Sequence, residues 1–198
     1  MSSQVSAEVI DLRSQRRMRS AAATADRLLD SATLLLRELP LTDVSLGAVA
    51  KHAGVPENAA AELFPSVSDV IVDICLRRIR GVDIATDATS GSVTRVTAQL
   101  TSAILLVAEE PAVAAACASV FLDPGQAGQR ARDVIGFEIH RLIVSASGPG
   151  AWPEVRTTLE LAFTGTLIQA AMGAMPYDVA VDRLRDAVHL LLEIGPQR

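Results

Sequence analysis

The sequence has few of the residues on which enzymes and metal sites usually depend. Aromatic residues make up 3% of the chain, and there are two cysteines, three histidines and a single lysine, Lys51. His52, His140 and His189 lie on different predicted helices, so no two of them share a metal-ligand spacing. No Walker loop, nucleophile elbow or paired-glycine dinucleotide motif is found. We therefore predict that the protein is not an enzyme and that it uses no metal ion or cofactor.

Cysteine usage and hydropathy limit the setting in which the protein works. Cys75 and Cys117 are far apart and neither belongs to a C-x-x-C pair, so the sequence predicts two buried free thiols. No basic N-terminal stretch precedes an apolar segment, and Thr, Gly and Gln interrupt the longest uncharged run. These features predict a soluble, cytoplasmic protein without a membrane partner.

The residues that are abundant predict an all-α protein. The hydrophobic fraction is 49%, and Ala- and Leu-rich segments repeat at helical spacing. No alternating apolar and polar run with turn residues indicates a hairpin. We expect helices over residues 20–38, 46–53, 57–64, 67–81, 92–109, 111–122, 129–145, 152–175 and 178–194.

The stretch from residue 45 to residue 64 predicts two short helices joined by a tight turn. Ser45 is suited to cap the first helix, because its hydroxyl accepts a free backbone N–H of the first turn. Gly54 stands where a helix ends in the left-handed conformation, which glycine adopts most easily. Pro56 suits the first turn of the second helix, and Pro65 ends that helix. This arrangement is typical of a helix-turn-helix.

Two pieces of this stretch resemble the TetR family of bacterial repressors. They are Ala-Val-Ala-Lys-His-Ala-Gly-Val at residues 48–55 and Phe-Pro-Ser at residues 64–66, and the likeness extends over roughly residues 19–80. The resemblance implies an N-terminal three-helix helix-turn-helix domain and a C-terminal helical ligand-binding and dimerisation domain. It also implies a homodimer and a palindromic double-stranded DNA operator. The expected parts are a flexible basic arm (1–18), the helix-turn-helix domain (19–66) and the second domain (67–198), with residues 67–86 as the linking helix.

The chain departs from the family pattern on the surface that is expected to face DNA. Family positions with Thr, Tyr and Lys that reach phosphates are here Ala59, Ala61 and Val67, which have no side-chain donor. Glu57 and Glu62 add negative charge to the same helix. These departures leave an alternative open, in which the protein keeps the fold, has lost operator binding, and is a small-molecule or partner-protein binding module.

If the protein binds DNA, most of the positive charge is expected to come from the arm. Residues 13–80 carry a net charge of +2, whereas residues 81–198 carry −5. Arginines before the first helix can follow a phosphate backbone or enter a minor groove, although a solubilising tail is the alternative. Asn58 is the best base reader, because its amide can bond adenine bidentately. The predicted DNA-binding residues are Arg13, Arg16, Arg17, Arg19, Ser45, Lys51, Pro56, Glu57, Asn58, Ala59 and Ala61.

The last two helices are expected to form the dimer interface. The first mixes bulky with small residues, which permit close approach, and the second has the three- and four-residue spacing of a bundle seam. Closure of the chain's own core by both helices is the alternative. The predicted interface residues are Leu159, Ala162, Gly165, Ala170, Gly173, Val181, Leu184, Val188 and Leu191.

A ligand pocket is expected between the helices of the second domain, as the family resemblance implies. Binding clefts are mostly apolar with a few polar anchors. The candidate wall residues, for each of which plain core is the alternative that its pattern favours, are Leu105, Phe121, Phe137, Trp152 and Phe163. Their lack of charge points to an apolar small molecule. The leading hypothesis is a TetR-like transcriptional regulator, a repressor that an apolar small-molecule effector releases from its operator.

Overall fold

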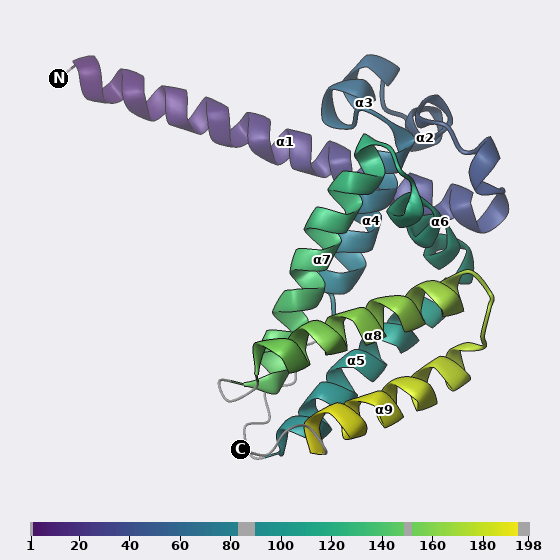
Figure 1. The fold of residues 1–198 in the computed structure, drawn as a ribbon. Helices are drawn as coiled ribbons and strands as arrows, with labels where there is room; N and C mark the ends of the chain where they lie inside the picture. Colours follow the sequence, from purple (N-terminus) through teal and green to yellow (C-terminus); the bar gives the residue numbers. More distant parts are fainter. Residues whose placement is uncertain (1, 83–89, 149–151, 194–198) are drawn as a thin grey trace. The chain divides into compact units, whose positions relative to one another are not determined.

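The computed structural model describes residues 2–82, 90–148 and 152–193, with side chains from Ser14 onward. All regular elements in these residues are helices, which confirms the predicted all-α class (Figure 1). The chain divides into two compact units, residues 1–71 and 72–198. The division falls inside the helix α4 (Val67–Arg80) and not after residue 66, so this helix belongs to both units.

The first unit is built around the second half of a long helix. Its elements are α1 (Ser2–Glu38), the short 3-10 helix η1 (Leu41–Asp43), α2 (Leu46–Ala53), α3 (Glu57–Leu63) and the first residues of α4. Helices α2 and α3 pack against each other and against α1. Ser66 caps α4, because its hydroxyl oxygen accepts the Asp69 N–H at 3.3 Å. The main core residues are Leu28, Leu29, Ala32, Leu36, Val49, Ala50, Ala60, Phe64, Val70 and Ile71.

Helix α1 begins at Ser2, which corrects the expectation of a flexible arm over residues 1–18. The physical reason is that no glycine or proline precedes Pro40, so nothing in the sequence breaks the helix. Side chains from residue 14 to residue 23 are exposed on every side, whereas Leu28 and Ala32 are fully buried. The basic segment is therefore a helical extension of α1, exposed over residues 14–23.

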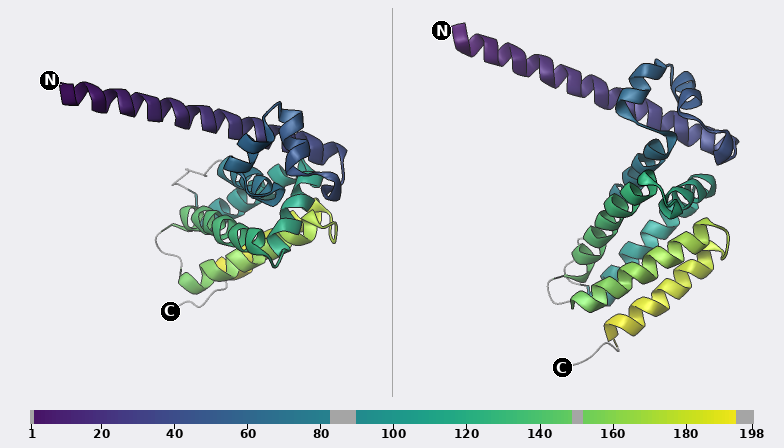
Figure 2. Two further views of the ribbon diagram at one scale, coloured as in Figure 1. Left: turned by 90° about the horizontal axis from the view of Figure 1, so that it is seen from above. Right: turned by 45° about the horizontal axis from the view of Figure 1, so that its top comes forward.

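The second unit is a bundle of helices around one apolar core. It contains the rest of α4, α5 (Ser92–Ala108), α6 (Pro111–Leu122), α7 (Gln126–Ser147), α8 (Pro153–Ala171) and α9 (Tyr177–Glu193). Helix α9 packs against both α5 and α8, and the three run side by side in Figure 2. Within the described residues no single helix is long and apolar enough to cross a membrane, and α5 and α6 qualify only together, with a 107° bend between them.

The core of the second unit takes up much of the predicted dimer interface. Leu159, Ala170, Val181, Leu184 and Val188 are all buried within the chain itself. The seam spacing of α9 serves its contacts with α5 and α8 within the chain, and the dimer interface stays a prediction. Of the remaining candidates, Ala162, Gly165 and Leu191 are half-buried and Gly173 is exposed.

The two cysteines are joined, so the prediction of two free thiols is wrong. Cys75 of α4 and Cys117 of α6 form a disulfide with their Cα atoms 6.2 Å apart. They are separated by 42 residues, and the chain returns through α5 to place α6 against the same cavity as α4. A sequence without a C-x-x-C pair excludes only a local redox motif and says nothing about helices that meet through the fold.

Candidate nucleic-acid interface and apolar cavity

The turn between α2 and α3 has the geometry that the sequence predicts. The Ser45 hydroxyl oxygen accepts the Ala48 N–H at 3.1 Å and so caps α2. Gly54 ends α2 with φ at +62°, in the left-handed region where a side chain would be strained. The Val55 N–H then donates to the Ala50 carbonyl at 2.9 Å, and the Val55 side chain is buried as a plug.

Arg27 of α1 ties that helix to the turn, and sequence reasoning missed this residue. Its guanidinium donates to the carbonyl oxygens of Ala53 and Gly54, the latter at 3.2 Å. A cation at this place also suits the partial negative charge at the C-terminus of α2. No local signal marks Arg27, because its acceptors lie 26 and 27 residues further along the chain.

Helix α3 presents a short polar face opposite its buried side. Ala60 and Phe64 are buried, whereas Asn58, Ala61 and Glu62 are exposed at the spacing that places them on one face. The predicted candidate Ala59 is half-buried, and Pro56 is exposed at the start of the helix.

The carboxylate of Glu57 lies close to Gly47 in the first turn of α2. A Cβ atom added to Gly47 would lie 3.1 Å from Glu57 Oε1, so this side chain rests against the first turn of α2. Negative charge is favourable at the N-terminus of a helix, where backbone N–H groups are unpaired within the helix. Glu57 therefore supports α2 and competes with any phosphate that approaches the same turn.

Positive charge is spread over two elements of the first unit. Arg16, Arg17 and Arg19 are exposed on the N-terminal half of α1, and Lys51 is exposed on α2. The Ser45 hydroxyl keeps its own O–H to donate, since its capping bond uses only a lone pair. Arg13 is helical, but its side chain lies outside the described part of the chain.

The second unit contains a cavity whose walls are almost entirely apolar. It opens to solvent, and α4, α5, α6, α7 and α8 all contribute to its lining. Of the predicted wall residues, Phe121 lines this cavity and Phe163 lines a smaller neighbouring one. Leu105, Phe137 and Trp152 line neither cavity, and their side chains are 52%, 66% and 40% exposed.

Three charged residues of α4 hold that helix to its neighbours in the second unit. Each makes an ion pair, and charged side chains near an apolar cavity need such partners. The pairs are Asp73 with Arg130 at 2.8 Å, Arg78 with Glu110 at 2.5 Å, and Arg80 with Glu138 at 2.7 Å. Arg78 and Glu110 also line the cavity, so a ligand there would meet one ion pair in an otherwise apolar wall.

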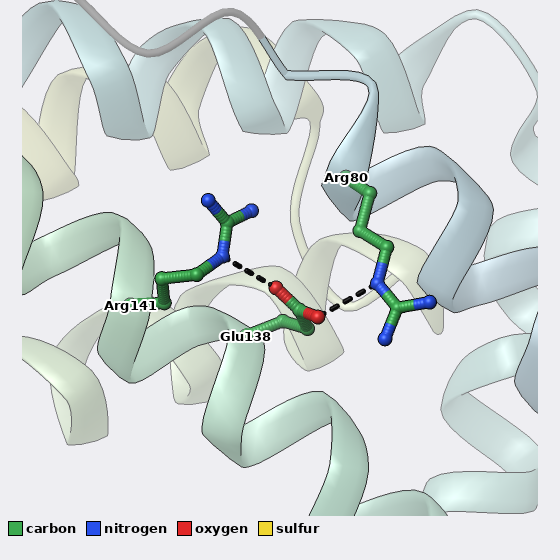
Figure 3. Close-up of polar contacts among 3 residues, drawn as sticks. All are labelled: Arg80, Glu138 and Arg141. Atoms are coloured by element: carbon green, nitrogen blue, oxygen red, sulfur yellow. Dashed lines mark hydrogen bonds and ion pairs between the residues drawn. The ribbon is translucent and has the colours of Figure 1, made fainter.

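Glu138 lies between two arginines and is nearly inaccessible to solvent (Figure 3). Its carboxylate accepts one N–H from Arg141 and one from Arg80, each at 2.7 Å. Hydrogen bonds from Arg141 and Arg80 lower the pKa of Glu138 below its ordinary value, although burial opposes this. This cluster joins the last residue of α4 to the middle of α7.

The chain is similar over most of its length to curated helix-turn-helix proteins. It is 40% identical over 178 residues to uncharacterized HTH-type transcriptional regulators of Mycobacterium bovis and Mycobacterium tuberculosis. The match covers 89% of this chain and 84% of each relative. No protein-family model matches the chain.

Solved structures of transcriptional regulators share its fold. A TetR transcriptional regulator from Rhodococcus sp. RHA1 has a TM-score of 0.72 at 23% identity, covering 86% of this chain and 96% of that one. FadR from Thermus thermophilus, a TetR family repressor solved with lauroyl-CoA, has a TM-score of 0.66 at 16% identity, covering 88% and 96%. At these identities the likeness extends to the fold alone.

Proposed function

Because this chain belongs to the HTH-type transcriptional regulators and shares the fold of TetR regulators, we propose that it is a TetR-type homodimeric repressor released by an apolar small molecule. The observation that carries the proposal is the presence of both required parts in one chain. The first unit has a capped helix-turn-helix with an exposed polar face on α3, and the second has an apolar cavity. Helix α4 runs through both units.

In this proposal α3 reads bases and the long α1 supplies affinity. Asn58 offers the one side-chain amide of the exposed α3 face and bonds adenine in the major groove. The phosphate contacts that Ala59, Ala61 and Val67 cannot make are provided by exposed arginines of α1, by Lys51 and by Ser45. The helical state of the basic segment supports this role, because it places the arginines on one continuous element.

The proposed effector is a molecule with an extended apolar part. The cavity walls are built mainly of Leu, Ile, Val, Ala and Phe side chains. The Thermus thermophilus repressor with the same fold binds lauroyl-CoA, which supports this class of ligand. Cys75, Arg78 and Ile79 of α4 line the cavity, so a bound molecule would push directly on the helix that continues into the first unit. Release from DNA then follows as a population shift between two positions of α4.

The proposed dimer is formed by the exposed side of α8 and α9. Leu161 and Met172 of α8 are 71% and 60% exposed, and Leu190 of α9 is 60% exposed. Large apolar side chains that gather on exposed helices are typical of a protein interface. To bind an operator, the two copies of α3 in the dimer need to reach successive major grooves, about 34–36 Å apart.

Selection of bound sequences from random duplex DNA tests the proposal. A regulator should enrich a palindrome, and an added apolar effector such as lauroyl-CoA should release it. No enrichment even at low salt would contradict operator binding. It would instead favour the alternative of a small-molecule or partner-binding module, which the acidic Glu57 and Glu62 motivate.

A further inference from the structure

The only two cysteines of the chain are bonded to each other across the wall of the apolar cavity. Cys75 lies on α4 and Cys117 on α6, and both residues line the cavity. The disulfide links α4 to α6 covalently. The ion pairs of α4 with α6 and α7 are non-covalent, so they can break and re-form without a chemical reaction. A change at this bond therefore alters how firmly the cavity wall is held.

Small reagents can reach the bond from the cavity. The cavity opens to solvent, and Cys117 is half-buried, whereas Cys75 is 6% exposed. A hydroperoxide or a dithiol is a small molecule that can enter this solvent-open cavity. When one cysteine of a pair is partly exposed and the other is buried, the exposed thiol reacts first and the buried thiol resolves the product.

We propose that Cys75 and Cys117 form a reversible oxidation site, with a hydroperoxide as the oxidant, that controls ligand access to the cavity. The Cys117 sulfur attacks the peroxide, an S–O bond forms, the O–O bond breaks, and an alcohol or water leaves. The Cys75 sulfur then displaces the sulfenic oxygen as water, so two thiols are oxidised and one peroxide is reduced. A dithiol reverses the reaction by two exchanges and becomes a disulfide itself.

The oxidised and reduced proteins should differ in how far α4 and α6 can move apart at the cavity wall. In the disulfide state the Cα atoms of Cys75 and Cys117 are held 6.2 Å apart, which fixes α4 against α6. Two free thiols need more room than a bonded pair, so reduction separates the sulfur atoms and loosens the wall. The reduced protein should therefore admit an apolar ligand more readily than the oxidised protein.

The test compares the two redox states of the full chain with the dye 1-anilinonaphthalene-8-sulfonate as the cavity probe. Protein is reduced with dithiothreitol, desalted, and half is reoxidised with one equivalent of hydrogen peroxide. Thiol alkylation followed by mass measurement counts the free cysteines in each sample. We expect the dye to bind the reduced form on the order of tenfold more tightly, within the range usual for coupling between sites.

Cys117→Ala is the matched control, because it keeps Cys75 and cannot form the internal disulfide. Its dye affinity should not change between the two treatments, and circular dichroism shows whether it folds. If the variant does not fold, the comparison of the oxidised and reduced wild-type protein still tests the proposal. Equal dye affinity in both states, tighter binding by the oxidised form, or failure of peroxide to restore the disulfide would overturn the proposal.

A parallel measurement separates this inference from the proposed function. Operator duplex obtained by the selection described above is titrated into both redox states without any effector. Absence of DNA binding in both states would contradict repression and leave the dye result intact. A redox effect on the dye together with normal DNA binding supports both proposals.

Discussion

Replacing Glu138 with glutamine tests whether the charge cluster in Figure 3 stabilises the second unit. The variant Glu138→Gln keeps the size of the side chain and one acceptor oxygen but removes the negative charge. The carboxylate is 6% exposed and accepts charge-assisted bonds from Arg80 and Arg141. Both bonds should weaken, and the two guanidinium groups would then face each other without an intervening anion.

The expected loss of stability in Glu138→Gln depends on how exposed Glu138, Arg80 and Arg141 are. A hydrogen bond to a charged group contributes about 1.5–3 kcal/mol when it is buried. Arg80 and Arg141 are 59% and 38% exposed, so water screens both ions and each bond lies below that range. We expect a loss of about 2 kcal/mol in the free energy of unfolding, which for a chain of this size lowers Tm by roughly 4–8 °C.

The effect should depend on pH in a defined direction. The arginines hold the pKa of Glu138 below its ordinary value in the folded chain. A carboxyl group with a depressed folded pKa stabilises the protein above its unfolded pKa, about 4.3, and this contribution disappears as pH falls through the folded pKa. The stability gap between wild type and Glu138→Gln should thus be full at about pH 6–7 and shrink below about pH 4.

Urea unfolding followed by far-UV circular dichroism measures this gap at several pH values. Asp182→Asn is the matched control, because Asp182 pairs with Arg185 at 2.6 Å and also at i, i+3, but its side chain is 70% exposed. It should cost no more than about 0.5 kcal/mol. The reasoning is refuted if the control costs as much as Glu138→Gln, or if the gap stays constant into the acid range.

Three further predictions concern DNA binding and assembly. Asn58→Ala should weaken operator binding by about 1–3 kcal/mol and leave random-sequence binding nearly unchanged in a gel-shift titration, and equal loss on both DNAs would remove Asn58 as a base reader. Combined replacement of Arg16, Arg17 and Arg19 by alanine should make the slope of log K against log salt shallower by up to about 5 per dimer, at about 0.9 for each lost phosphate contact; an unchanged slope would place the affinity elsewhere. Leu161→Glu should weaken the dimer by about 2 kcal/mol or more in sedimentation, the size of an interface hot spot, whereas an unaltered dimer would move the interface away from α8.

Local chemistry allowed much of the first unit to be predicted. The Ser45 cap and the left-handed Gly54 depend on contacts within a few residues, and the structure has both of them. The second unit was harder, because its features depend on which helices meet. The spacing of residues along the sequence predicts neither the pairing of Cys75 with Cys117 nor the position of Glu138 between two arginines.

The candidate sites also differ in how far the sequence alone could predict them. The exposed face of α3 follows from helical periodicity once Ala60 and Phe64 are assigned to the core, so Asn58 could be named from the sequence. Large apolar residues of the second unit could not be sorted in this way. Phe121 lines the cavity while Phe137 is exposed, because the direction of a side chain depends on the neighbours of its helix and not on its own size.

Helix α1 is buried around Leu28 and Ala32 and exposed over residues 14–23, and its backbone should open in stages. Isolated helical segments without packing are marginal in water, so the amides of residues 14–23 should exchange with solvent through local fraying. Amides near Leu28 and Ala32 should exchange only when the whole unit unfolds. A protection boundary therefore crosses a helix that has no kink, glycine or proline. A partner that binds these arginines must keep residues 14–23 helical, and the lost conformational entropy lowers its binding free energy.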